Sequence, residues 1–109
     1  MDRIEIEKTI VRELVTRALN EGWTVSVGDS EEWPVMRSTN PEEIIEATRS
    51  TDQDCLLFHR AADKTCIGYV DLVYGNGIDV ISDHSCGGPL DRFMEDVFEW
   101  VGTLEEQES

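Results

Sequence analysis

The chain has 109 residues, of which 24 are acidic and nine are basic, so its formal net charge is −15. Such a surface repels nucleic acid and anionic membranes, and it attracts basic partners, including proteins that hold phosphates. The composition therefore argues against direct binding of nucleic acid or of a membrane surface, while a 39% hydrophobic content supports one folded core.

The first half of the chain predicts one long helix followed by two strands. Apolar residues at helical spacing predict a helix over residues 4–21. Apolar and polar residues then alternate, which predicts a strand over residues 23–27, and a second strand is expected over residues 35–38. The segment 31–34 between these strands is predicted to be an acidic loop that carries the indole ring of Trp33.

The middle of the chain predicts a short helix and three strands. Asn40 can cap a helix that starts at the next residue, which is a proline. The apolar run 55–58 predicts a central strand, and a hairpin turn leads from it into a strand over residues 66–74. The Gly-Asn-Gly sequence at residues 75–77 predicts a tight turn directly into a strand over residues 78–83.

A final helix is predicted from Pro89, because apolar residues recur there at steps of three and four. The element order α-β-β-α-β-β-β-α predicts an α+β fold in which a mainly antiparallel sheet of about five strands packs with helices. We expect a single domain over residues 1–109, with a disordered tail over residues 105–109.

The acidic excess is unevenly distributed along the chain. Residues 1–21 hold five acidic and four basic side chains, whereas residues 91–109 hold seven and one. On the final helix, the acids lie opposite the apolar stripe, and a four-residue spacing places three of them in one row. The acids of this helix that we take as candidate partner-binding residues are Asp91, Glu95, Asp96 and Glu99.

Two interpretations of this acidic row stay open. A row of carboxylates can replace phosphates in the groove of a basic protein. Charged runs also commonly form a solvated face that keeps a small protein soluble. Two interpretations also exist for Asp71, Asp79 and Asp83. These aspartates could hold a divalent cation, but they are more typical of a solvated sheet face.

A second candidate partner-binding group is the acidic loop with Glu31, Glu32 and Trp33. An aromatic side chain beside carboxylates is typical of an interface with a basic protein. The alternative is that Trp33 packs back onto the sheet.

Thiol and imidazole side chains are the candidate groups for metal binding and nucleophilic catalysis. The three cysteines are an odd number at wide spacing, which favours reduced thiols. Neither CxxC nor HxxxH spacing occurs, and no phosphate-binding or serine-nucleophile motif is present. We therefore expect no enzyme activity, no cofactor and no bound metal. The thiols and imidazoles of the chain are those of Cys55, His59, Cys66, His84 and Cys86.

The amino terminus lacks the basic and then apolar pattern of a signal peptide. No apolar run approaches the roughly 20 residues that span a bilayer. We therefore expect a cytoplasmic protein.

Five segments of turns and strands carry a family resemblance: residues 25–33, 37–40, 50–52, 72–76 and 79–83. They are similar to segments of small acidic proteins of unknown function that temperate phages and prophages encode. This resemblance implies an accessory protein that binds and inhibits host machinery, including restriction and CRISPR complexes. It implies no catalytic residue.

The leading hypothesis is a non-enzymatic binding protein, of the anti-CRISPR or DNA-mimic type, that inhibits a nucleic-acid-binding host defence complex. Its expected partner is a basic or nucleic-acid-binding protein. The alternative is a small structural or regulatory protein that forms a homodimer through a sheet edge, without mimicry of nucleic acid.

Overall fold

The computed structural model describes residues 2–28, 32–49, 52–85 and 87–108, with the backbone alone for residues 105–108. Within these residues, three α-helices and five strands follow one another in the predicted order. The elements are α1 (Arg3–Asn20), β1 (Trp23–Gly28), β2 (Val35–Ser38), α2 (Pro41–Ala47), β3 (Gln53–Arg60), β4 (Cys66–Val73), a short 3-10 helix η1 (Gly77–Asp79), β5 (Ile81–His84) and α3 (Gly88–Glu108). The predicted α+β class is confirmed.

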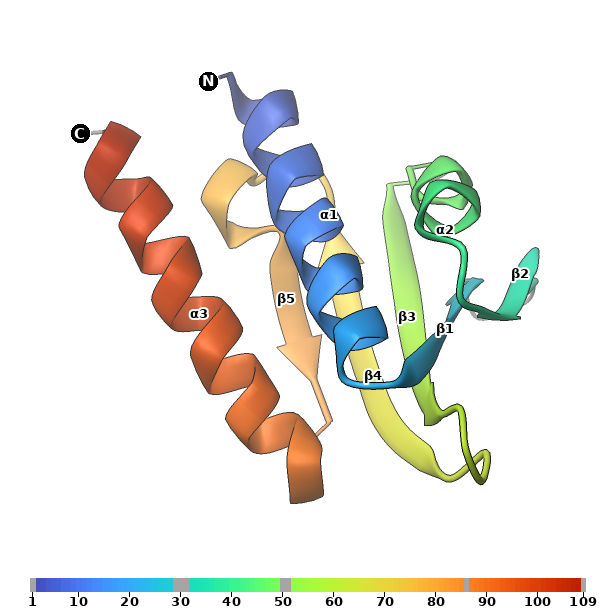
Figure 1. Cartoon of the computed structure of the whole chain (residues 1–109). Coiled ribbons are helices and arrows are strands. Elements are labelled where there is room, and N and C mark those ends of the chain that lie inside the picture. Colours follow the sequence, from blue (N-terminus) through green and yellow to red (C-terminus); the bar gives the residue numbers. More distant parts are fainter. Residues whose placement is uncertain (1, 29–31, 50–51, 86, 109) are drawn as a thin grey trace.

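The five strands form one antiparallel sheet in the order β2-β1-β3-β4-β5. The apolar run that predicts a central strand lies in β3, which is the middle strand of this sheet. Figure 1 shows β2 at one side of the molecule and α3 beside β5 at the other. The two ends of the sheet are therefore far apart.

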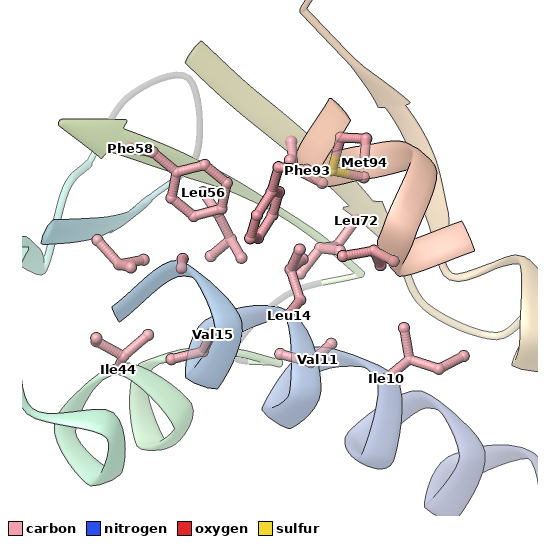
Figure 2. Close-up of a cluster of buried hydrophobic side chains, with 14 of the residues drawn as sticks. Ile10, Val11, Leu14, Val15, Ile44, Leu56, Phe58, Leu72, Phe93 and Met94 are labelled. Carbon is pink, nitrogen blue, oxygen red and sulfur yellow. The ribbon is translucent and has the colours of Figure 1, made fainter. Parts of the chain in front are cut away.

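One face of the sheet packs against the helices. Alternate side chains of β1, β3 and β4 are buried there together with side chains of all three α-helices. Figure 2 shows Leu14 of α1 facing Leu56 of the sheet in this core. The rings of Trp23, Phe58 and Phe93 contact one another, with centroids 4.8 to 6.0 Å apart. Aromatic contacts of this kind add to the burial of apolar area and fix α3 against the sheet.

The opposite face of the sheet carries the other set of alternating side chains. Cys55 and Leu57 of β3 and Tyr69 and Asp71 of β4 are only half-buried there. All three described α-helices contribute to the core on the first face, so none of them covers this second face. We call it the open sheet face.

The turn after β4 differs from the predicted tight hairpin. η1 separates the glycine-rich turn from β5, which begins at Ile81 and not at residue 78. The backbone N–H groups of Gly75 and Gly77 donate to the carboxylate of Glu7 in α1. This contact widens the turn, because it holds the loop against a helix that lies about 70 residues earlier in the chain.

The start of α2 and the end of α3 can be compared with the helix cap and the disordered tail that the sequence predicts. Asn40 caps α2, because its Oδ1 accepts hydrogen bonds from the backbone N–H groups of Glu42 and Glu43 at 3.0 and 3.4 Å. The backbone of α3 is helical through Glu108 and Ser109 lies outside the described residues, so the disordered tail stays a prediction. No helix within the described residues has the length and apolar character needed to cross a membrane.

Candidate functional site

The predicted row of carboxylates lies on the solvent side of α3. Leu90, Phe93, Met94 and Val97 are buried in the core, which turns the opposite side of the helix outward. The four acids on this outward side are exposed: Asp91, Glu95, Asp96 and Glu99. Successive acids of the row Asp91, Glu95 and Glu99 are about 6 Å apart along the helix axis.

Phe98 adds an apolar side chain to this acidic surface. It is 43% exposed and lies three residues after Glu95 and seven after Asp91, so it lies on the same side of α3. Its ring centroid lies 5.8 Å from that of His84 in β5. We call Asp91, Glu95, Asp96, Phe98 and Glu99 the acidic α3 face.

The charge of the acidic α3 face is largely uncompensated. None of its four acids takes part in an ion pair among the described residues. The described part of α3 contains one basic side chain, Arg92, which is exposed. Asp91 also has a structural contact, because its carboxylate accepts a hydrogen bond of 2.9 Å from the backbone N–H of Gly87. The other three acids are therefore the better candidates for contact with a partner.

Trp33 lies over the open sheet face, on the other side of the sheet from the α3 contacts. A Cβ atom added to Gly28 would lie 2.5 Å from Cδ2 of Trp33, so the indole ring rests directly on the β1 backbone. The ring is nevertheless 36% exposed. The structure thus shows the packing of Trp33 onto the sheet, and a role of its exposed part in partner binding stays a prediction. Glu32 is exposed, and Glu31 lies outside the described residues.

A pocket of about 360 Å³ lies beside the Trp33 ring. Its lining combines side chains of the open sheet face with the ends of β3, β4 and β5. Its lining includes Trp33, Cys55, Asp71, Val73 and Ser82. The structure therefore separates the two predicted partner-binding regions, because the acidic α3 face and this pocket belong to opposite sides of the sheet.

The thiols and imidazoles form no metal site among the described residues, where no group of three suitable ligands occurs. Burial, with the nearby carboxylates of Asp71 and Asp54, raises the pKa of Cys55 to about 12. Burial, with the charge of Arg37, lowers the pKa of His59, whose Nδ1 has no hydrogen-bond partner in the described part of the chain. Both groups are uncharged at neutral pH, which disfavours a thiolate–imidazolium pair. Cys86 lies outside the described residues.

The prediction that Asp71, Asp79 and Asp83 lie on one sheet face is wrong for Asp79. Asp79 lies in η1, because the widened turn delays the start of β5. Asp71 and Asp83 are directly opposite each other in the β4–β5 pair.

A buried polar network that no sequence motif predicts holds one end of the molecule together. Glu7 is fully buried, and it binds Arg49 at 2.8 Å and the turn after β4 at 2.7 and 2.9 Å. Arg49 also lies over the ring of Tyr74, whose hydroxyl donates to Asp54. Glu7 lies at positions i−3, i−4 and i−7 from the buried residues Ile10, Val11 and Leu14. This spacing is the signal that could have revealed a buried acid.

The comparisons with known proteins add no family assignment. No protein-family model matches the chain, and neither a curated protein nor a solved structure matches it.

Proposed function

We propose that this protein is a non-enzymatic binding protein whose acidic α3 face occupies a basic, nucleic-acid-binding surface of a partner protein. The observation that carries the proposal is the set of exposed carboxylates on α3 that form no ion pair among the described residues, beside the exposed ring of Phe98. Phosphate-binding surfaces of proteins present Lys and Arg side chains, which bind carboxylates by the same charge-assisted hydrogen bonds.

Two physical arguments support a functional role for this face. An exposed apolar ring among charges gains free energy when a partner covers it, because it is then removed from water. Uncompensated charge also accelerates encounter with an oppositely charged protein, at a cost in self-repulsion. A face that only aids solubility needs the charges but not the exposed ring.

The proposal extends to the biological setting that the sequence resemblance implies. We propose a phage-encoded, cytoplasmic inhibitor of a host nucleic-acid-binding defence complex, of the anti-CRISPR or DNA-mimic type. The inhibitor would act by competition for the site of the nucleic acid, so it needs no catalytic group. The uncharged state of Cys55 is in keeping with a non-catalytic role.

The proposal is tested by affinity capture from a bacterial host lysate with matched charge variants. One variant neutralises three acids of the acidic α3 face: Glu95→Gln, Asp96→Asn and Glu99→Gln. The control variant neutralises three exposed acids elsewhere, with the same change in net charge: Glu21→Gln, Glu46→Gln and Asp79→Asn.

We expect the wild-type protein and the control variant to retain the same basic protein, and the α3 variant to retain at least about tenfold less of it. Three lost charge pairs of about 0.5 kcal/mol each correspond to such a factor. Equal retention by both variants would show that bulk charge, not the acidic α3 face, attracts the partner.

A further inference from the structure

The pocket beside Trp33 combines an aromatic ring, an apolar wall and a carboxylate. Its volume of about 360 Å³ is at the small end of the range for small-molecule sites. The indole of Trp33 forms one wall, and Val73 adds apolar surface. The polar lining residues are Gln53, Asp54, Asp71 and Ser82. The carboxylate of Asp54 already accepts hydrogen bonds from the backbone N–H of Arg49 and the hydroxyl of Tyr74, which leaves Asp71 as the carboxylate for a ligand. We call this site the Trp33 pocket.

The strand register determines how these groups are spaced. Gly28 of β1 pairs with Cys55 of β3, Cys55 pairs with Asp71 of β4, and Asp71 pairs with Asp83 of β5. These positions form one row across the open sheet face, and each step along the row is about 4.8 Å. Since the Trp33 ring rests on Gly28, Cys55 lies between the ring and Asp71. The backbones of Gly28 and Asp71 are two steps of the row apart, which is about 10 Å.

The charge of this row is negative and unbalanced. Asp71 and Asp83 are directly opposite each other, an arrangement of like charges that destabilises a strand pair. No Lys or Arg lies among the described residues that line the pocket. Burial and the nearby carboxylates keep the thiol of Cys55 uncharged, so the floor between ring and carboxylate is neutral.

We propose that the Trp33 pocket binds a guanidinium or primary ammonium group carried on a short alkyl chain. The cation would stack on the face of Trp33 and donate hydrogen bonds to the carboxylate of Asp71, while the alkyl chain contacts Val73 and the thiol of Cys55. An aromatic face and a carboxylate on opposite walls are the two groups that together recognise an organic cation. The inference goes beyond the proposed function, because it involves no residue of the acidic α3 face.

The same cation could come from an arginine or lysine side chain of a protein or from a free small molecule. The probes are therefore the peptide Ac-Gly-Arg-Gly-NH2, its citrulline analogue and ethylguanidinium. Citrulline has the shape of arginine but no charge, so it separates recognition of the cation from simple filling of the pocket.

Binding is measured by titrating each probe into ¹⁵N-labelled protein and following the indole N–H signal of Trp33, assigned from its loss in Trp33→Phe. We expect a saturable shift with the arginine peptide, and binding at least about tenfold weaker for the citrulline peptide. Asp71→Asn should weaken arginine binding to the same extent. Asp79→Asn changes the net charge equally outside the pocket and should alter the affinity by less than about twofold.

Three outcomes overturn the proposal: equal binding of the arginine and citrulline peptides, an unchanged affinity in Asp71→Asn, or an equal loss in Asp71→Asn and Asp79→Asn. The comparison with the citrulline peptide needs no variant, so it tests recognition of the cation even if Asp71→Asn folds poorly.

An arginine peptide that binds more than tenfold tighter than ethylguanidinium identifies a protein side chain as the ligand, and similar affinities identify a free cation. The α3 variant should bind the arginine peptide like the wild type, so failure of this inference and failure of the proposed function are distinguishable.

Discussion

Glu7 is a fully buried carboxylate that links α1 to the loop at the far end of β4. Burial by itself would raise its pKa, but hydrogen bonds from Arg49, Gly77 and Gly75, with the guanidinium charge, together lower the pKa below 4.5. The spacing of buried residues in the first helix could have located this acid. Its partners could not be predicted, because they lie 42 to 70 residues away in the chain.

Replacement of Glu7 by glutamine should lower the free energy of unfolding by about 2 kcal/mol at pH 7, because Arg49 and the backbone N–H groups of Gly75 and Gly77 then lose their charged acceptor. The lowered pKa of Glu7 stabilises the fold above pH 4.5, and this contribution is lost as the pH falls through the folded-state pKa. Glu7→Gln should therefore show a weaker acid dependence of stability than the wild type. Urea denaturation between pH 7 and pH 3 measures both effects. The exposed Glu5→Gln is the control, and an equal stability of Glu7→Gln and Glu5→Gln would contradict this account.

At the scale of the elements, local sequence signals were sufficient to predict the three α-helices and the five strands in their order, but not the short helix η1 or the start of β5 at Ile81. The cap at Asn40 and the apolar run in β3 predict elements that the structure confirms. The widened turn at η1 was missed, because a long-range contact to Glu7 decides it. The place of Trp33 on the sheet also depends on the β1–β3 register and on the lack of a side chain at Gly28, which local patterns do not reveal.

Two glycine variants test the packing of Trp33 on β1. In Gly28→Ala, the added Cβ would lie 2.5 Å from the indole ring and from the carbonyl oxygen of Glu32, so the ring must move away from the strand. We expect a loss of about 1–3 kcal/mol in stability and a shift of the Trp33 indole signal. Gly102→Ala in α3 meets no atom within 4 Å and should stabilise the protein by about 0.5–1 kcal/mol. An unchanged Trp33 signal in Gly28→Ala would rule out the observed packing.

At the scale of the whole molecule, acidic side chains lie on both sides of the sheet: those of α3 on the helix side, and Asp71 and Asp83 on the open sheet face. The helical spacing of α3 predicted which carboxylates face outward, and the structure places them there. The Trp33 pocket could not be predicted, because its residues come from three strands and from the loop that carries Trp33. Local sequence patterns do not reveal which strands are neighbours in the sheet.

The alternative of a homodimer through a sheet edge also belongs to this scale. The edge strands β2 and β5 are four residues each, and the pairing of each contains a register shift. Short, irregular edges offer few backbone groups to a second copy. We therefore expect the mass of one chain, 12.4 kDa, by light scattering at both low and high salt. A dimer that persists at high salt would favour the structural or regulatory alternative.

The central claim is that the acidic α3 face competes with nucleic acid for one surface. The most direct measurement is displacement of a fluorescent DNA duplex from the captured partner by the wild-type protein, by the α3 variant and by the control variant. We predict that the wild type and the control displace the duplex with equal potency, and that the α3 variant is at least about tenfold less potent. A partner that binds the protein and the duplex at the same time, or equal potency of all three proteins, would contradict the claim.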